Sequence, residues 1–336
     1  MHNDGSTEEE DFMFRYERLL PILLALALGA AALPARAQDW PARPIRLVVA
    51  FAPGGVHDTV ARVIAPRLTE LLGQAIVIDN RPGAGGNIAA DLVAKAAPDG
   101  YTFLVASEAI ATNEFLYRSL SYDPKKDLAP VTKLADYPMV FVAHPGLPAN
   151  TLAEFVRLAR DESSRINFGS AGLGTSGHLA GELFKSIAGV RMEHVPYKGG
   201  APAMADLVAG RIQVMIISVS LSAPQLRPGR IKAFAVAGRQ RAAQMPEVPT
   251  TAESGYPDFE ALLFSSLFAP SQTPAAIVAR MSSEVGQAMR QPEVAARLRE
   301  LGAVPAPGTP EEFRKTLEAI GVRWGKLIRD NNIRVN

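Results

Sequence analysis

Glycine-rich turns that each join a buried apolar segment to a helical one constrain the fold of this chain more than any other feature. They occupy residues 51–58 (FAPGGVHD), 80–87 (NRPGAGGN) and 169–178 (GSAGLGTSGH). Before the first turn, the unbroken apolar run 45–51 is typical of a buried strand, and after it Val60, Ile64 and Leu68 recur at helical spacing. This alternation of strand, glycine turn and helix predicts parallel β-α-β units.

The alternation occurs in two successive series, which predicts two α/β units, each a mainly parallel sheet flanked by helices. Expected strands are 45–51, 75–80 and 101–107 in the first series, and 139–145, 166–172, 192–198 and 213–218 in the second. The C-terminal third begins with a strand at 232–238, ends in helices, and is too short for a third domain. We therefore expect lobe 1 to comprise 38–137 and 230–336, and lobe 2 to comprise 138–229.

The N-terminal segment has the pattern of a secretory signal peptide. Two arginines precede the apolar run 19–33, and the A-x-A sequence of 35–37 follows it. A membrane anchor is the alternative, but the run is too short to span a bilayer comfortably. We expect a signal peptide over 1–37, cleaved near Ala37, and export to the periplasm. Because acidic residues precede the arginines, we predict that translation starts at Met13.

The composition argues against several classes of function. The 35 Lys and Arg residues nearly balance the 34 Asp and Glu residues, so no nucleic-acid-binding surface is expected. The absence of cysteine rules out disulfides, thiolate metal sites and cysteine nucleophiles. The histidines show neither H-x-x-x-H nor H-x-H spacing, and no G-x-S-x-G motif occurs. We expect no metal site, no cofactor and no enzymatic activity.

The glycine turns are candidate anion sites. The first N–H groups of a helix lack intrahelical partners, and the helix dipole favours negative charge there. Gly172–Gly177 matches the dinucleotide motif G-x-G-x-x-G, and Glu193 lies about twenty residues further on. However, Glu193 falls near the start of its expected strand, whereas the ribose-binding acid should end it. The hydroxyls of Thr175 and Ser176 suit a small carboxylate better. A turn that only reverses the chain is the simplest alternative.

Several residues in these turns have a structural role as an alternative to a binding role. We expect Asp58 to be the N-cap of the helix after the first turn, and Thr175 or Ser176 to cap the helix after the third. Phe51 is interpreted as a cleft wall or as a core residue. Lys198 is interpreted as a solvated loop residue or as a cationic clamp.

Long stretches of the chain resemble one protein family. Residues 43–107, 166–215 and 245–261 are similar to segments of the substrate receptors of tripartite tricarboxylate transporters, also called the Bug receptors, and the likeness runs from about Trp40 to the end. The resemblance implies a two-lobed periplasmic binding protein of type II-like fold, with a hinge between the lobes. It also implies a small organic acid as ligand, membrane permease subunits as partners, and a monomer.

The resemblance further implies that loop backbone, hydroxyls and ordered waters hold the ligand. The candidate ligand-binding residues are Phe51, Gly54, Gly55, Asp58, Gly85, Gly86, Asn87, Ser107, Asn113, Ser170, Ala171, Gly174, Thr175, Ser176, His178 and Ser218. Two positions depart from the family pattern. Ile217 stands where an Asp is common, which argues against an amino-acid ligand, and His57 replaces a residue that is usually small.

Together these features predict a receptor for a C3–C8 mono- or dicarboxylate, aromatic acids included. Each lobe is expected to direct helix N-termini into one cleft, so that the ligand bridges the lobes and closes them. A periplasmic sensor that acts on a signalling partner is the first alternative. A dinucleotide-dependent enzyme or a hydrolase is the second.

Overall fold

The computed structural model describes residues 40–261, 263–331 and 333–335. Arg43–Asn336 forms one compact unit. The predicted signal peptide, its cleavage site and the predicted start at Met13 lie outside the described residues. In the described part of the chain, no helix combines the length and the apolar character needed to cross a bilayer.

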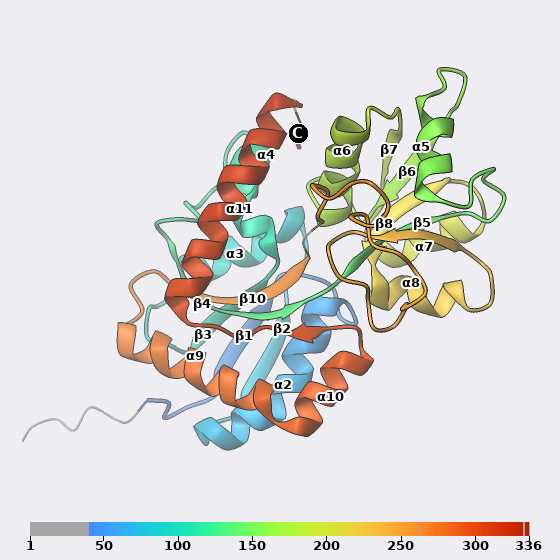
Figure 1. Ribbon diagram of the computed structural model, residues 1–336. Helices are drawn as coiled ribbons and strands as arrows, with labels where there is room; N and C mark the ends of the chain where they lie inside the picture. The colour runs from blue at the N-terminus through green and yellow to red at the C-terminus, as the bar shows by residue number, and fades with distance from the viewer. Residues whose placement is uncertain (1–39, 262, 332, 336) are drawn as a thin grey trace, which may run out of the picture. The chain divides into compact units, whose positions relative to one another are not determined.

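The first sheet has the strand order β11-β4-β10-β3-β1-β2. Its strands are β1 (Ile45–Val49), β2 (Ile76–Asn80), β3 (Thr102–Ala106), β4 (Leu128–Asp136), β10 (Phe264–Pro270) and β11 (Val304–Pro305). Strands β2, β1 and β3 are parallel, as predicted, whereas β10 runs antiparallel to both β3 and β4. The chain therefore completes this sheet with a strand that comes from far along the sequence (Figure 1).

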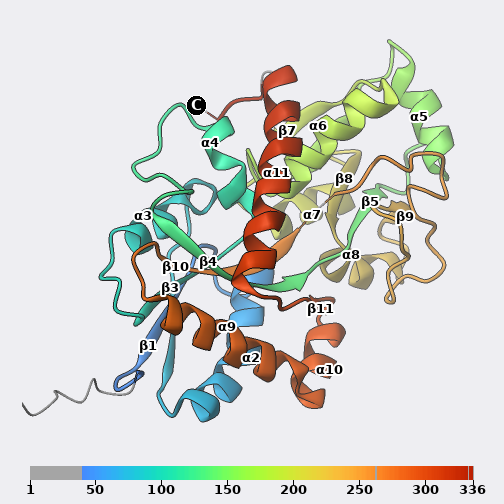
Figure 2. The same cartoon turned by 60° about the vertical axis from the view of Figure 1, so that its left-hand side comes forward.

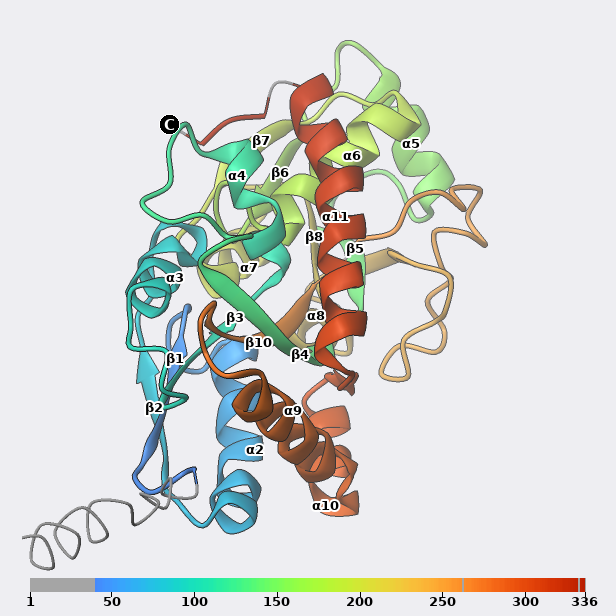
Figure 3. The same cartoon turned by 90° about the vertical axis from the view of Figure 1, so that its left-hand side faces the viewer.

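Helices cover both faces of the first sheet (Figure 1). One face carries α2 (Val56–Leu72), α9 (Ala275–Arg290) and α10 (Pro292–Glu300), which also contact one another (Figure 3). The other face carries α3 (Asn87–Ala94) and α11 (Pro310–Asp330). Figure 2 shows α11 running past β4 and α4 (Asn113–Leu116), both of which it contacts. We call this sheet with its helices the first lobe.

The second sheet has the order β7-β6-β8-β5-β9. Its strands are β5 (Met139–Ala143), β6 (Asn167–Ser170), β7 (Glu193–Pro196), β8 (Val214–Ser218) and β9 (Lys232–Val236). The helices beside it are α5 (Leu152–Arg160), α6 (Ser176–Ala188), α7 (Gly200–Val208) and α8 (Val219–Leu226). Strands β7, β6 and β8 are parallel, and β5 pairs antiparallel with β8 and β9. We call this sheet with its helices the second lobe.

Aromatic packing fixes the position of α6 in the second lobe. The ring of Phe184 on α6 lies 5.1 Å from that of Phe141 on β5, which in turn lies 5.0 Å from that of Phe155 on α5. A Cβ atom on Gly181 would lie 2.2 Å from the ring of Phe168 on β6, so this helix position has no room for a side chain. Because the third glycine turn joins β6 directly to α6, the N-terminus of the helix lies near the carboxyl end of the strand.

The structure corrects the predicted boundary at residue 230. Strand β9, inside the predicted lobe 1 segment, pairs with β5 of the second sheet, and the chain rejoins the first sheet only at β10. The apolar run 232–238 predicts a buried strand but carries no information on which sheet it joins. Strand β4 and helix α8 were not predicted, because Pro130 and Pro224 interrupt their patterns.

Candidate ligand-binding cleft

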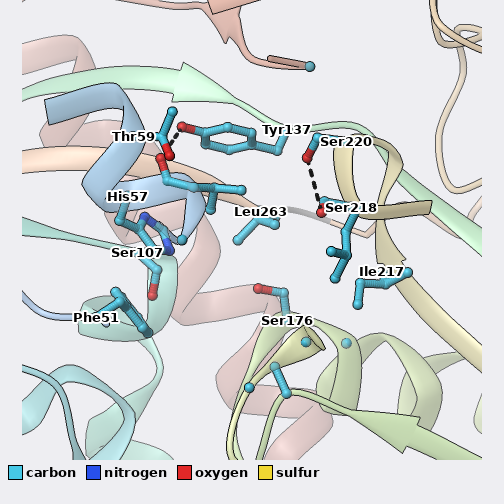
Figure 4. Close-up of a pocket in the computed structure, with 18 of the residues that line it drawn as sticks. Phe51, His57, Thr59, Ser107, Tyr137, Ser176, Ile217, Ser218, Ser220 and Leu263 are labelled. Carbon is cyan, nitrogen blue, oxygen red and sulfur yellow. Dashed lines mark hydrogen bonds between the residues drawn. The ribbon is translucent and has the colours of Figure 1, made fainter. Parts of the chain in front are cut away.

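A cavity of about 1020 Å³ lies between the two lobes. The first residues of four helices contribute to its wall: α2 from the first lobe, and α6, α7 and α8 from the second. Figure 4 shows Phe51, His57 and Ser107 on one side of this space, and Ser218 and Ile217 on the other. The cavity therefore collects helix N-termini from both lobes, including those of α2 after the first glycine turn and α6 after the third, but not that of α3 after the second.

The first glycine turn is held by Asp58, which does not line the cavity. The N–H of Gly54 donates to Oδ2 of Asp58 at 2.8 Å, while Arg62 Nε and Asn80 Nδ2 each donate to the same carboxylate at 2.9 Å. Burial would raise the pKa of Asp58, but these hydrogen bonds outweigh it and lower the pKa. The N-cap of α2 is Gly55, so the prediction that Asp58 is the cap was wrong. Asp58 lies within the first helical turn and fastens the loop before it.

Aromatic groups form the wall next to this turn (Figure 4). The rings of Phe51 and His57 stack with centroids 4.2 Å apart, and His57 Nδ1 lies 2.6 Å from Oγ of Ser265. Burial lowers the pKa of His57 to about 3, so the imidazole is neutral at physiological pH. The hydroxyl of Tyr137 donates to the carbonyl of Val56 at 2.8 Å. This part of the wall is consequently uncharged and largely apolar.

The second glycine turn contributes only Gly85 to the cavity. Behind it, Asn113 Nδ2 donates to Oδ1 of Asn87 at 2.8 Å and to the carbonyl of Gly85 at 3.4 Å. The hydroxyl of Tyr122 donates to the same oxygen of Asn87 at 2.8 Å. The predicted residues Gly86, Asn87 and Asn113 therefore do not face the cavity. The two asparagines hold the shape of the turn that presents Gly85.

The third glycine turn is braced from within by its own side chains. The hydroxyls of Ser170 and Thr175 donate to the carbonyl of Gly172 at 2.9 and 2.8 Å. The N–H of Gly174 donates to Nδ1 of His178 at 3.0 Å. Thr175 is the N-cap residue of α6, but its side chain makes no capping bond. Ser170 and His178 lie outside the cavity wall and shape the turn.

Two helix starts, one in each lobe, offer free amide groups to the cavity. The first main-chain bond of α2 runs from Thr59 N–H to the carbonyl of Gly55, and that of α6 from Leu179 N–H to the carbonyl of Thr175. N–H groups that precede these bonds have no acceptor within their helix. The cavity-lining residues that carry them are Val56, His57, Ser176 and Gly177. Both helix starts can donate to an anion.

Glu108 is a cavity residue that the sequence analysis missed. It follows Ser107 directly after β3, begins a short 3₁₀ helix (Glu108–Ala111), and is buried. Its Oε2 accepts from the N–H of Phe264 at 3.2 Å, and its Oε1 accepts from the hydroxyl of Ser176 across the lobe boundary. Burial raises the pKa of Glu108 to about 7 despite these hydrogen bonds. An acidic residue immediately after a buried strand was the available signal.

The remaining wall is mainly apolar, with polar groups at a few points. Oγ of Ser220 donates to Oγ of Ser218 at 3.2 Å (Figure 4). The charged residues that also line this cavity are Lys198, Arg227 and Glu300, and the apolar ones include Met139, Ile217, Leu221, Leu263, Leu298 and Leu301. The apolar side chains surround space for a ligand body beyond the helix starts.

Ten of the sixteen predicted ligand-binding residues line the cavity. They are Phe51, Gly54, Gly55, Gly85, Ser107, Ala171, Gly174, Thr175, Ser176 and Ser218. The other six, which lie behind the wall, are Asp58, Gly86, Asn87, Asn113, Ser170 and His178. Other lining residues belong to no motif that the sequence shows. Examples are Thr59, which lies within α2, and Tyr137, which lies where the chain crosses between the lobes.

The model of the tripartite tricarboxylate transporter family receptor matches residues 60–333. The chain belongs to this family. It is 34% identical to protein BugT of Bordetella pertussis, over 95% of this chain and 98% of that protein. It is 40% identical to a protein of the tcbD–tcbE intergenic region of Pseudomonas sp. strain P51, over 94% of this chain and 95% of that one.

Solved structures of similar receptors share the fold. The chain is similar to Rpa4515 of R. palustris with adipate, with a TM-score of 0.82 and 39% identity over 88% of this chain and 100% of that one. It is similar to MatC of Rhodopseudomonas palustris with bound malate, with a TM-score of 0.76 and 35% identity over 86% of this chain and 100% of that one. This member of the tricarboxylate receptor family has the two-lobed α/β fold of periplasmic binding proteins. It is a solute-binding receptor and not an enzyme, so the G-x-G-x-x-G match at Gly172–Gly177 does not mark a dinucleotide-dependent catalyst.

Proposed function

We propose that this receptor captures a small organic carboxylate between its lobes in the periplasm and delivers it to the membrane subunits of a tripartite transporter. The observation that carries the proposal is the pair of helix starts, Val56–His57 in α2 and Ser176–Gly177 in α6, that line one cavity. Similar solved receptors hold adipate and malate, which are both dicarboxylates. A carboxylate that accepts from both helix starts would bridge the lobes.

Neutral donors suit a receptor that must release its ligand. A buried arginine would bind a carboxylate strongly, but it would leave an uncompensated charge in the empty cavity. Amide groups at a helix start provide favourable electrostatics without that cost. The two basic residues of the cavity wall, Lys198 and Arg227, come from outside the two helix starts.

The ligand body is proposed to be apolar, aliphatic or aromatic, within the range C3–C8. The stacked rings of Phe51 and His57 can contact a flat or extended hydrocarbon, and Ile217 adds a further apolar side chain. Because Ile217 offers no carboxylate to an ammonium group, we propose a ligand without an amino group. A second carboxylate at the far end of the body would lie near the second-lobe polar groups Ser218 and Ser220.

We further propose that the lobes close by rotation about two chain crossings. The first is the link between β4 and β5, at Tyr137 and Pro138, and the second precedes β10. The N–H of Tyr137 donates to the carbonyl of Leu263 at 2.8 Å, which ties the crossings together. With this assignment, the second lobe extends from Pro138 through β9 to the second crossing. Ligand contacts that exist only in the closed form would drive the closure.

A screen of organic acids by thermal shift tests the proposal. Purified mature protein is expected to gain thermal stability with one or more C3–C8 mono- or dicarboxylates and to show no shift with NAD. The double substitution Thr175→Val with Ser176→Ala should weaken the best ligand at least tenfold, because it removes the Ser176 hydroxyl that lines the cavity and the Thr175 hydroxyl that braces the turn. Stabilisation by NAD alone, or unchanged affinity in the double variant, would count against the proposed site.

Delivery to a transporter needs a separate measurement. Cells that lack this receptor should lose saturable uptake of the labelled acid and regain it when the receptor is restored. Size-exclusion chromatography with light scattering should give the mass of a monomer. Binding without receptor-dependent uptake would favour the sensor alternative.

A further inference from the structure

The hydrogen bond between Glu108 and Ser176 joins the first lobe to the start of α6, beside the proposed carboxylate site. We propose that Glu108 is a positioning residue that couples carboxylate binding to the uptake of one proton, by setting the direction in which the Ser176 hydroxyl donates. This inference rests on the proposed function, because it assigns the ligand carboxylate to the cavity that Ser176 lines.

Both oxygens of Glu108 have defined partners. Oε2 accepts from the N–H of Phe264 at 3.2 Å, so this oxygen acts as an acceptor in either protonation state. Oε1 contacts the hydroxyl of Ser176, the first residue of α6. Only in the contact between Oε1 and the Ser176 hydroxyl can donor and acceptor exchange roles. A proton taken up by Glu108 therefore belongs on Oε1.

The two protonation states present different groups to the ligand. When Glu108 is ionised, the Ser176 hydroxyl donates to Oε1, and its lone pairs and the nearby negative charge oppose a carboxylate. When Glu108 carries a proton, Oε1–H donates to Oγ of Ser176. The Ser176 hydrogen is then free to donate to the ligand, next to the amide groups of α6. The carboxylate ligand should therefore bind preferentially to the protonated form.

The small cavity beside Glu108 is otherwise lined by neutral side chains. This cavity has a volume of about 10 Å³ and is lined by Glu108, Thr112, Ser176, Leu179 and Trp324. On α6, burial lowers the pKa of His178 to about 4, and His57 in the ligand cavity is also neutral. Ion pairs on the packed elements are Glu182–Lys185 on α6, Lys133–Asp136 on β4, Lys125–Glu114 at α4 and Arg323–Glu260 at α11. Of the other charged groups on α11, Arg329 lies over the ring of Phe115 and Glu318 is exposed. Lys198, Arg227 and Glu300 line the larger ligand cavity.

The pKa of Glu108 allows this carboxyl group to gain or lose a proton near neutral pH. Burial raises the pKa of this carboxyl to about 7, so both states are populated near neutral pH. A carboxylate placed beside it adds like charge and raises the pKa further. Linkage then requires proton uptake on binding, and the affinity should fall by up to tenfold per pH unit above the pKa of the free receptor.

Calorimetry with adipate, or with the acid that gives the largest thermal shift, tests the coupling. Titrations at pH 8 in buffers of different ionisation enthalpy should report uptake of about one proton, and the affinity should drop about tenfold between pH 7.5 and 8.5. In Glu108→Gln, the amide can donate to Ser176 and accept from Phe264, so it mimics the protonated state. This variant should bind without proton uptake and with an affinity that does not change with pH.

Matched variants separate the mechanism from its alternatives. Glu182→Gln makes the same substitution on α6 outside the cavity and should keep the pH dependence of the unmodified receptor. Ser176→Ala should reduce the pH dependence, because no hydroxyl remains to reverse; a full slope in this variant would overturn the hydroxyl mechanism. Tight carboxylate binding without proton uptake would overturn the inference while leaving the proposed function intact. If no acid binds at all, both are refuted.

Discussion

Replacing Asp58 by alanine should destabilise the first glycine turn and weaken ligand binding at the same time. A hydrogen bond to a charged group contributes about 1.5–3 kcal/mol. The hydrogen bond from Arg62 contributes little to the free energy of unfolding, because the Arg62 side chain is 52% exposed to solvent. The bonds from Gly54 and Asn80 remain, and the lower end of the range for two bonds gives a loss of about 3 kcal/mol in the free energy of unfolding.

Urea denaturation at pH 7 measures the loss, and calorimetry with the best acid measures binding. The matched control is Asp79→Ala, which removes a carboxylate on β2 whose partners Arg46 and Arg81 are 38% and 51% exposed. The control should lose about 1 kcal/mol or less and keep its affinity. Equal destabilisation of the two variants, or unchanged affinity in Asp58→Ala, would refute the role assigned to Asp58.

The same variant has a pH signature with a definite sign. The pKa of Asp58 is lower in the folded protein than its ordinary value of 3.8. Its contribution is therefore fully present above that value and is lost as the pH falls through the folded pKa. The stability difference between the unmodified protein and Asp58→Ala should be constant from about pH 6 to 8 and shrink below about pH 4. A difference that grows on acidification would contradict the assignment.

Two further substitutions test the packing of α6 and the polarity of the cavity. Gly181→Ala should lower the free energy of unfolding by about 1–3 kcal/mol, measured by urea denaturation, because the new methyl group would meet the ring of Phe168 at 2.2 Å. Unchanged stability in this variant would show that the helix can shift without cost. Ile217→Asp should weaken binding of a plain dicarboxylate by at least tenfold and improve that of an acid with an amino group, as measured by calorimetry; unchanged preference would show that Ile217 does not contact the ligand.

The parallel cores of both sheets could be predicted from local pattern. The apolar runs, the glycine turns and the helical spacing each depend on a few adjacent residues, and they specify β1–β3 and β6–β8 correctly. The sheet to which strand β9 belongs could not be predicted from local pattern. Its apolar sequence predicts burial, but its pairing with β5 depends on α8 and the short link that follow β8, which sequence spacing does not reveal.

The position of the candidate site could be predicted from the glycine turns, but the side chains that face the cavity could not. Residues Asp58, Asn113 and His178 carry polar groups of the right kind close to the turns, and the structure aims all three at the turn backbone. Glu108 shows the opposite case. Its neighbour Ser107 was predicted, yet the contact of Glu108 with Ser176 joins segments 68 residues apart. Such long-range contacts follow from the fold and leave no local pattern.

The position of β10 has a consequence for how the molecule assembles. This strand lies between β3 and β4 in the first sheet, yet the whole second sheet comes between β4 and β10 in the sequence. As the polypeptide is made, β3 and β4 have no partner on their facing edges until residues 264–270 have been added. The first lobe is thus the first to be partly synthesised and the last to be completed. A shortened chain that ends before β10 would leave the facing edges of β3 and β4 free to pair with strands of other molecules.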